Sequence, residues 1–436
     1  MYNVNIERIK ETLFTLSRIG YNEEDKGIYR PGFSAADFEA RNWLMDLAQS
    51  EGFRTHMDGA GNVHIEYGPE NTSAVVVGSH LDSVPAGGMF DGTLGVIAGL
   101  ECLRVLKHHD VALKHPVRVV ATAEEEGRFG GMFGAQALTG KLTPHDILTM
   151  HDADGYLLSD AMKSCGLDPM QALSAAFSPE DLKCFIELHI EQGPVLDQTG
   201  IQIGVVDGIS GVFKWIVKLV GKADHAGTAP MEMRSDAFMG LADFAHEINR
   251  IIDEDGTEYS RITVGKAELK PGFAHTIAGE VDFTLVVRDM DQHIMEALSQ
   301  ACRKALSAIA RRHQLMFEYE QVSWLAPQHC SPVLTDFIAE QAQQLGLNYQ
   351  RMPSGAGHDC QFFTSLTETG LIFIPSVNGI SHAPDEWSHW HDVEAGANLL
   401  LACVATQATS SGLVKATRKG DKKVTKIANN SNKKVG

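Results

Sequence analysis

The sequence predicts an α/β protein in which a mostly parallel central sheet is interrupted by an inserted unit. In the first 208 residues, short β-branched runs alternate with helical segments, as in parallel sheets covered by helices on both faces. Between residues 209 and 323 the expected order becomes β-α-β-β-α-β, and a helix and a buried strand return afterwards. We therefore expect a discontinuous main domain (1–208 and 324–410), an inserted domain (209–323) and a tail (411–436).

Local patterns support the elements of the main domain. Apolar residues recur with helical spacing over residues 5–19, and Gly20 ends that segment. Ser34, with Asp37 three positions later, has the pattern of a capping box and begins a second helix that ends at Gly52. The other expected elements are strands at 62–67, 74–77, 117–121, 184–188 and 371–374, and helices at 92–106 and 332–345.

The insert has its own pattern of elements. We expect strands at 212–220, 261–269, 279–288 and 315–321, and helices at 235–252 and 292–312. This order is a split β-α-β unit of self-contained size. At 436 residues the chain is also too long for one ordinary hydrophobic core, which favours two domains.

Composition and charge exclude several classes of partner. The net charge is −19 and aromatic residues make up 7% of the chain, so a surface for nucleic acid or anionic membrane is not expected. The segment from Ser411 to Gly436 has eight Lys/Arg and one Asp, which leaves 29 bases and 55 acids, or −26, in the rest. This basic tail lacks apolar periodicity, and we expect it to be disordered.

The distribution of cysteines and apolar residues predicts a cytoplasmic protein. The seven cysteines are scattered without a CxxC pair, which is typical of buried thiols in a reducing compartment. The first residues, MYNVNIERIKETLFTL, form an amphipathic helix rather than a signal peptide, and no apolar run is long enough to span a bilayer.

Five candidate metal ligands stand in five separate motifs that are rich in glycine. A site for two metal ions needs about this many ligands, one of them a carboxylate that bridges both ions, and a further carboxylate to act as base. Two of the motifs directly follow expected parallel strands, where α/β proteins place their sites. The ligands are His80 in GSHLDSV, Asp91 in GGMFDGTLG, Glu126 in TAEEEG, His189 in IELHIEQGP and His382 in GISHAPDE.

Each motif taken alone also allows a plainer interpretation. His80 can bind metal while Asp82 fixes its other ring nitrogen, or the HLD segment can be a polar turn. Glu124–Glu126 can be a solvated acidic turn. Three adjacent carboxylates after a buried strand repel one another unless cations neutralise them, however, so we expect Glu126 to ligate and Glu125 to act as base. Glycines on both sides of Asp91 permit the close backbone approach that a bridging ligand needs.

Two further histidines have weaker local signals, and other catalytic motifs are missing. His189 lies in an expected strand, where a lone histidine is more often structural, and His382 has competitors in His389 and His391. The chain has no GxSxG motif, and the segment PSGAGHD (353–359) shows no strand–serine–helix pattern, so a serine hydrolase is not expected. No P-loop or GxGxxG occurs in its required context.

Together and in this order, the motifs resemble those of the two-metal aminoacylase/carboxypeptidase superfamily, and specifically of its hydantoinase/carbamoylase branch. The resemblance covers residues 5–410. The branch is indicated by HIEQGPVL, in which His189 replaces the carboxylate usual in the peptidases, and by DHAGTAPM (224–231), SGAGHD (354–359) and GISHAPDE.

The resemblance implies an exopeptidase-like catalytic domain, a ferredoxin-like insert that serves as lid and dimerisation domain, and roles for individual residues. Asp91 would bridge two divalent ions, with His80 and His189 on separate ions and with Glu126 and His382 completing the set. Glu125 would be the general base, supported by Asp82. His225 would stabilise the oxyanion and reach the site of a partner subunit. The substrate would contact Gln192, His225, His275, Arg288, Ser354 and Gly357, with Arg288 pairing with a carboxylate.

Two segments depart from the pattern of the family. His275 stands in AHTIAG (274–279), where the family commonly has asparagine, and the segment from Glu126 to Phe129 is one residue shorter than usual. His275 is then either a substitute donor or the mark of a different substrate.

The resemblance implies hydrolysis of N-carbamoyl (ureido) amino acids or allantoate-like compounds, with release of ammonia. Two ions, zinc or manganese with cobalt or nickel as alternatives, would activate the water. The substrate would be a small ureido or amide compound with a carboxylate, and the protein a homodimer. A dipeptidase or N-acyl-amino-acid deacylase of the same superfamily is the main alternative, and a metal-free binding or scaffold protein is the third.

Overall fold

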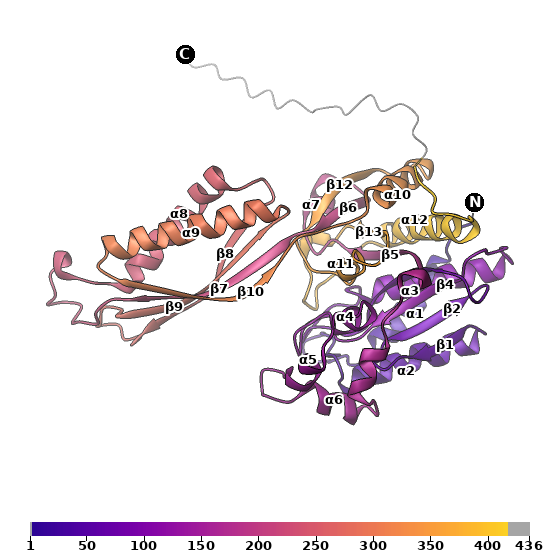
Figure 1. Cartoon of the computed structure of the whole chain (residues 1–436), viewed down its shortest axis with the longest axis horizontal. Coiled ribbons are helices and arrows are strands. Elements are labelled where there is room, and N and C mark those ends of the chain that lie inside the picture. The colour runs from indigo at the N-terminus through magenta and orange to yellow at the C-terminus, as the bar shows by residue number, and fades with distance from the viewer. Residues whose placement is uncertain (1, 417–436) are drawn as a thin grey trace, which may run out of the picture.

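The computed structural model describes residues 2–416, which form two lobes joined by a narrow neck (Figure 1). The larger lobe contains a nine-stranded sheet in the order β1-β2-β4-β3-β5-β13-β6-β11, and β12 also pairs with β6. Its strands are β1 (Arg54–Met57), β2 (Val63–Tyr67), β3 (Ala74–His80), β4 (Val117–Thr122), β5 (Leu182–Ile190), β6 (Ile203–Ile209), β11 (Gln328–His329), β12 (Tyr349–Ser354) and β13 (Thr369–Ile374).

The centre of this sheet is parallel, as the sequence predicts. Strands β4, β3, β5 and β13 are consecutive parallel neighbours, whereas β1, β2 and β11 pair in antiparallel fashion toward the two edges. The four central strands consist almost entirely of buried residues because helices cover both faces. Their carboxyl ends lie at one edge of the sheet, so residues at these ends come together.

Five long helices cover one face of the large sheet and form the main core. They are α1 (Ile6–Ser17), α2 (Ala35–Ser50), α3 (Thr93–His108), α10 (Pro332–Gln344) and α12 (Trp390–Thr409). Shorter helices lie against the other face or around it: α4 (Phe133–Leu138), α5 (Pro144–Thr149), α6 (Leu158–Ser164), α7 (Val195–Thr199) and α11 (Cys360–Phe363). The side chain of Ser34 caps α2 by accepting from the backbone N–H of Asp37, the first half of the expected capping box.

The smaller lobe has its own four-stranded antiparallel sheet, in the order β10-β7-β9-β8. Its elements follow the predicted order: β7 (Gly211–Val220), α8 (Ala237–Asp255), β8 (Arg261–Lys270), β9 (Glu280–Asp289), α9 (Gln292–Arg312) and β10 (Met316–Leu325). The two helices pack on one face of the sheet around a separate core, and the other face is uncovered (Figure 1). Domain boundaries at 209 and 323 stay a prediction.

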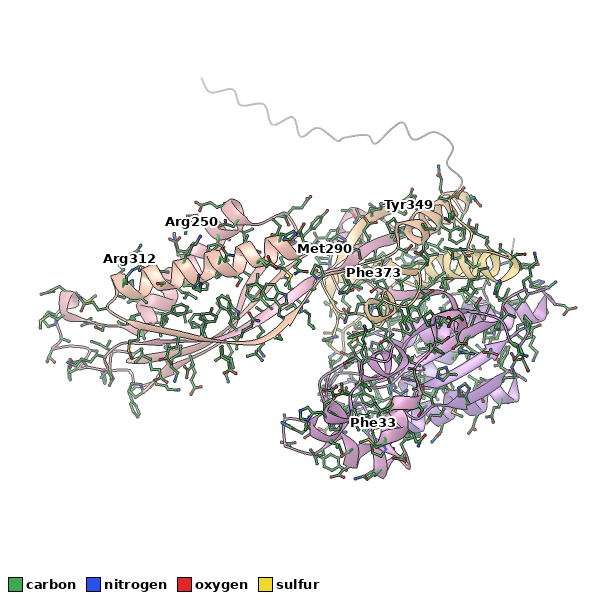
Figure 2. The ribbon with its side chains drawn as sticks, viewed as in Figure 1. Phe33, Arg250, Met290, Arg312, Tyr349 and Phe373 are labelled. Carbon is green, nitrogen blue, oxygen red and sulfur yellow. The ribbon has the colours of Figure 1, made fainter. Side chains whose placement is uncertain are left out.

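The neck consists of two short crossings between the sheets. Only Ser210 separates β6 from β7, and two residues separate β10 from β11. Met290 lies at this neck (Figure 2), and a Cβ atom at Gly208 would come within 3.0 Å of its Cε atom. The crossings are therefore closely packed against the end of β9.

The sequence analysis missed several elements of the larger lobe. Strands β1, β6, β11 and β12 and the long helix α12 were not predicted, and β3 and β10 extend further than expected. The predicted disordered tail lies outside the described residues from position 417 onward. Among the described residues, no helix is long and apolar enough to cross a membrane. All seven cysteines are free thiols, and six of them are buried.

Candidate metal centre

The five predicted ligands converge at the carboxyl-terminal edge of the parallel strands. His80 ends β3 and His189 is the penultimate residue of β5, while Glu126 lies in the loop after β4. Asp91 lies just before α3, and His382 lies in the loop between β13 and α12. The three strands involved are neighbours in the order β4-β3-β5, which brings residues far apart in the chain into one site.

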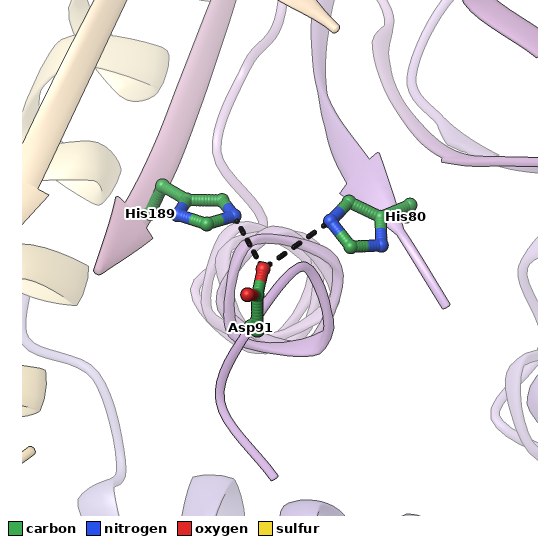
Figure 3. Close-up of side chains that lie close together, drawn as sticks. All are labelled: His80, Asp91 and His189. Atoms are coloured by element: carbon green, nitrogen blue, oxygen red, sulfur yellow. Dashed lines mark ion pairs between the residues drawn. The ribbon is translucent and has the colours of Figure 1, made fainter. Parts of the chain in front are cut away.

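One oxygen of Asp91 faces two buried histidines. The Nε2 atom of His189 lies 3.1 Å and that of His80 lies 3.4 Å from Oδ1 of Asp91 (Figure 3). Both imidazoles are at most 3% exposed. Their strands are adjacent and both side chains point to the same oxygen atom, an arrangement that favours one shared ion. The predicted placement of His80 and His189 on separate ions stays a prediction.

The other oxygen of Asp91 faces ligands that come from loops. The Nε2 atom of His382 lies 3.2 Å from Oδ2 of Asp91 and 3.4 Å from Oε2 of Glu126. The side chain of His382 is 49% exposed, so this half of the centre opens to solvent. Asp91, which touches both halves, occupies the position of a bridging ligand.

The backbone around Asp91 is built for close approach. Gly92 has φ of 65°, and a Cβ atom there would lie 2.4 Å from the ring of His80. Only glycine fits this position without displacing the imidazole. The expected close backbone approach beside Asp91 is thus found at Gly92, while the bridging role of Asp91 stays a prediction.

The second nitrogen of each buried imidazole contacts the backbone. Nδ1 of His80 lies 2.9 Å from the carbonyl oxygen of Asp82, and Nδ1 of His189 lies 2.8 Å from that of Ile190. These contacts aim the Nε2 atoms at Asp91. The carboxylate of Asp82 is 3.9 Å from Nδ1 of His80, so the residue orients the ring through its main chain, contrary to the expected role of its side chain.

The carboxylate of Asp82 instead supports the acidic turn. Its two oxygens accept hydrogen bonds from the backbone N–H groups of Glu125, at 3.2 Å, and Glu126, at 3.1 Å. Behind it lies Arg41, a fully buried residue of α2 with a nitrogen 3.9 Å from Asp82 and an ion pair to Asp37 at 2.9 Å. Arg41 also donates to the carbonyl oxygens of Ala121 and Thr122 at the end of β4.

Glu125 lies next to the candidate metal ligands. Its Oε2 atom lies 3.7 Å from Nε2 of His80, at the inner side of the metal-ligand cluster. Burial raises the pKa of Glu125 well above its usual value, with a partial opposing effect of His80 and a further increase from Glu126. Because its pKa is raised, the carboxylate of Glu125 is suited to accept a proton from a group bound at the candidate site.

The donor set fits divalent cations. Burial, followed by the charge of Asp91, raises the pKa of Glu126 to about 7, and one of its oxygens is buried without a hydrogen-bond partner. Cations bound between these carboxylates would remove the repulsion and satisfy the free oxygen. Imidazole and carboxylate ligands suit Zn²⁺, Mn²⁺, Co²⁺ and Ni²⁺ alike.

Three residues near Asp91 complete the site, and the sequence analysis found only one of them. The predicted Gln192 donates from its side-chain amide to Oδ2 of Asp91 at 2.8 Å. Ser381 donates to the same oxygen at 3.1 Å, and Glu386 accepts from the backbone N–H of Asp91 at 3.0 Å. Ser381 and Glu386 both lie in the GISHAPDE motif, but no pattern within that motif distinguished them.

Gln192 and His382 both have left-handed backbone conformations, a strain that occurs often at functional sites.

Comparison with known proteins identifies the family. A family model described as peptidase family M20/M25/M40 matches residues 76–406. The chain belongs to this family. It is 36% identical to an N-carbamoyl-L-amino-acid amidohydrolase from Paenarthrobacter aurescens over 401 residues, which cover 91% of this chain and 96% of that protein. It is 34% identical to the allantoate amidohydrolase of Escherichia coli (strain K12) over 399 residues, which cover 90% and 96%.

Solved structures place the chain in the hydantoinase/carbamoylase branch of the M20 family. A hydantoinase/carbamoylase family amidase from Burkholderia multivorans superimposes with a TM-score of 0.88 at 31% identity, covering 94% of this chain and 99% of that one. The predicted family and branch are thus confirmed. The M20 family is metal-dependent, in agreement with the candidate ligand groups.

The remaining predicted residues divide into those near the candidate metal centre and those far from it. Arg288, at the neck end of β9, lines two cavities, of about 440 Å³ and 680 Å³. The smaller cavity reaches Glu125, Glu126 and Gly357, and the larger one reaches Gln192. Arg288, Gly357 and Gln192 therefore all border space beside the ligands.

Ser354 has a different environment from the one predicted. It ends strand β12, and the short helix α11 follows the turn, so the segment does have a strand–serine–helix order, contrary to the sequence analysis. Ser354 is nevertheless buried, and its hydroxyl contacts the carbonyl oxygen of Ala356 and the ring of His358. It stabilises the turn that carries Gly357 and is not exposed to substrate.

His225 and His275 lie away from the metal ligands of their own chain. They are neighbours, because the backbone N–H of Ala226 donates to the carbonyl oxygen of His275. His225 follows β7 and His275 precedes β9, both at the outer end of the small lobe. Ten residues of β7, at about 3.3 Å each, separate this end from the neck by roughly 30 Å. Among the competing histidines of the large lobe, His391 pairs with Asp392 and joins no candidate metal group of residues 2–416.

Proposed function

We propose that this protein is a metal-dependent amidohydrolase that cleaves the C–N bond of N-carbamoyl amino acids or allantoate-like ureido acids and releases ammonia. The observation that carries the proposal is the convergence of two histidines on Oδ1 of Asp91 and of a further histidine beside Oδ2, with Glu126 next to it. The names of relatives that align over nine-tenths of the chain supply the substrate class.

We assign the ligands in two groups. His80 and His189 share one ion with Asp91, and Glu126 and His382 share the second ion with the other oxygen of Asp91. Zinc and manganese are the first candidates, and cobalt and nickel are alternatives. When bound, such ions supply Lewis-acid activation of water and of the ureido carbonyl group.

The residues of the chain supply the proton transfers and the orientation. Glu125 accepts the proton of the attacking water and returns it to the nitrogen that leaves as ammonia. Gln192, on the rim, donates a hydrogen bond to the ureido group, and Arg288 pairs with the carboxylate of the substrate through its planar fork. Movement of the small lobe about the neck closes the two cavities over the substrate and excludes water.

A homodimer in the cytoplasm agrees with the position of His225. This residue is exposed at the outer end of the small lobe, far from the metal ligands of its own chain, so its predicted contact with the oxyanion requires the site of a second subunit. His275 lies beside it and is available as a further donor to the same substrate. The carboxylate–arginine and oxyanion–histidine contacts would then come from different subunits.

A substrate panel tests the proposal directly. Protein supplied with each of the four metals is mixed with N-carbamoyl-L-amino acids, allantoate, dipeptides and N-acetyl-L-amino acids, and ammonia and free amines are measured. Ammonia release from ureido compounds is the expected result. Turnover of dipeptides or N-acetyl compounds with no turnover of ureido compounds would identify the alternative peptidase or deacylase. Inactivity with every metal would favour a binding protein.

A further inference from the structure

The larger of the two cavities at the neck extends well beyond the metal ligands. It has a volume of about 680 Å³ and runs from Gln192, whose amide contacts Asp91, to Arg261 at the start of β8. Residues of both lobes line it. The cavity thus has room for a substrate that continues past the reacting group toward the insert.

Two arginines face each other in this cavity. Arg261 and Arg288 are direct partners in the antiparallel ladder of β8 and β9, so their side chains leave the same face of the sheet. This is the open face, because the neighbouring residues Ile262 and Val287 pack into the core under the helices. Like charges in directly opposed positions destabilise a sheet unless something neutralises them.

Nothing in the described chain neutralises this pair. Among residues 2–416, no carboxylate lies within ion-pair distance of Arg261 or Arg288. Burial without any compensating acid lowers the pKa of Arg288. Two backbone carbonyls, of Glu258 and Ser260, each accept from one nitrogen of Arg261 at 2.8 Å, which fixes the side chain while its other N–H groups stay available.

Two other basic residues of this region have acidic partners. On the same sheet, Lys270 contacts both Glu280 and Asp282. Arg351 lines the same cavity and pairs with Asp207 and Asp336. Among the three arginines that line the larger cavity, Arg261 and Arg288 are thus the two without an acidic partner in the described chain, which indicates that their partner is an anionic ligand.

We propose that Arg261 and Arg288 together recognise substrates with two acidic groups, so that ureido acids with a second carboxylate on the side chain are preferred. This inference rests on the proposed function and specifies its substrate class. Arg288 borders both cavities, including the one that reaches Glu125, and therefore binds the carboxylate nearer the reacting carbon. Arg261 borders only the larger cavity and binds the second carboxylate.

A matched pair of substrates isolates the charge of the side chain. N-carbamoyl-L-glutamate and N-carbamoyl-L-glutamine have nearly the same shape and differ in one carboxylate. We expect kcat/KM to favour the glutamate compound by roughly 10- to 100-fold, the usual size of a charge-assisted hydrogen bond. Arg261→Gln should abolish the preference through KM, and Arg261→Glu should reverse it. Both variants replace an exposed side chain at the beginning of an edge strand and leave the core intact.

A control variant removes the same charge from a different surface. Arg250 belongs to helix α8 of the small lobe (Figure 2), is exposed, and lines neither cavity. Arg250→Gln should keep the glutamate preference unchanged. Equal kcat/KM for the two compounds in the wild-type protein, or an undiminished preference in Arg261→Gln, overturns the inference while the proposed function stands.

A binding measurement separates this inference from the reaction. If no ureido compound is hydrolysed, the proposed function fails, but the same two compounds can be compared as ligands by thermal unfolding of the metal-loaded protein. The glutamate compound should raise Tm more than the glutamine compound, and Arg261→Gln should remove the difference. Equal shifts in the wild-type protein would show that the arginine pair does not bind a second carboxylate.

Discussion

The two halves of the candidate metal centre are built differently, although they share Asp91. The half at Oδ1 takes its histidines from the adjacent strands β3 and β5, and both side chains are buried. The half at Oδ2 takes Glu126 and His382 from loops, and His382 is half exposed. Ligands on strands are positioned by the sheet itself, whereas ligands on loops need support from other residues.

That support is visible around the loop-borne half. Asp82 binds the backbone of Glu125 and Glu126, and Arg41 lies behind it. On the other side, Glu386 accepts from the backbone of Asp91 and from the hydroxyl of Ser381, next to His382. We therefore expect the Oδ1 half to bind its ion more tightly, and the Oδ2 half to depend on residues that touch no metal ion.

Replacement of Asp91 removes the feature common to both halves and should have the largest effect. In Asp91→Asn, the side chain between the three imidazoles loses one oxygen atom and its negative charge. It can then no longer serve as a shared ligand for both ions. Activity should fall by more than the roughly 10²- to 10⁴-fold attributed to a general base. Metal content, measured by elemental analysis after gel filtration, should drop below that of variants changed in one half only. Retention of both ions would mean that Asp91 does not bridge.

Replacement of Glu125 should show whether this residue acts as the base or as a metal ligand of either half. Glu125→Gln preserves the shape of the side chain but cannot accept a proton, so kcat should fall by about 10²- to 10⁴-fold. Metal content should remain that of the wild-type protein. Loss of metal together with activity would make Glu125 a ligand, and retained activity would remove it from the proton transfer.

A pair of histidine variants tests the difference between the halves. His189→Ala removes a buried ligand from the Oδ1 half, and His382→Ala removes an exposed ligand from the Oδ2 half. Each should lose one ion per chain, but His189→Ala should also lower Tm because it opens a cavity between His358 and Asp91. The Tm and the metal content of the two variants, measured side by side, decide whether the buried ligand contributes more to stability than the exposed one. Equal Tm values would contradict the comparison.

The sequence could identify the five candidate ligands because each follows a recognisable strand or glycine turn, and all five come together in the structure. It could not show which candidate ligands face the same oxygen of Asp91. The order of elements along the chain does not reveal that β3 lies between β5, which carries His189, and β4, which precedes Glu126. Ser381 and Glu386 were missed since a hydrogen bond to Asp91 leaves no periodic signal. Helix α12 was missed because it begins inside the polar SHWHD segment (388–392), which was interpreted as a surface cluster, although the rest of the helix packs on the sheet.

Arg41 offers a test of indirect support for the Oδ2 half. Arg41→Lys keeps the positive charge but cannot reproduce the hydrogen bonds of the guanidinium to Ala121 and Thr122 beside its pair with Asp37. We expect metal affinity at the Oδ2 half to fall by about 10- to 100-fold, as for other residues that orient metal ligands. Added metal should restore kcat, because Glu125 and the substrate contacts remain. A loss of kcat that metal does not restore would show that Arg41 acts on more than metal binding.

The smallest expected effect, taken over one pH unit, is the dependence of metal affinity on pH at the exposed half. In the metal-free protein, the hydrogen bond to Asp91 raises the pKa of His382 to about 9, and burial raises that of Glu126 to about 7. An ion must displace the proton of His382 below pH 9, and that of Glu126 as well below pH 7. Affinity should therefore fall by up to about tenfold per pH unit between pH 9 and 7 and more steeply below, measured by chelator competition. His382→Gln should remove the first of these slopes and keep the second, and a flat profile between pH 7 and 9 in the wild-type protein would show that His382 is not a ligand.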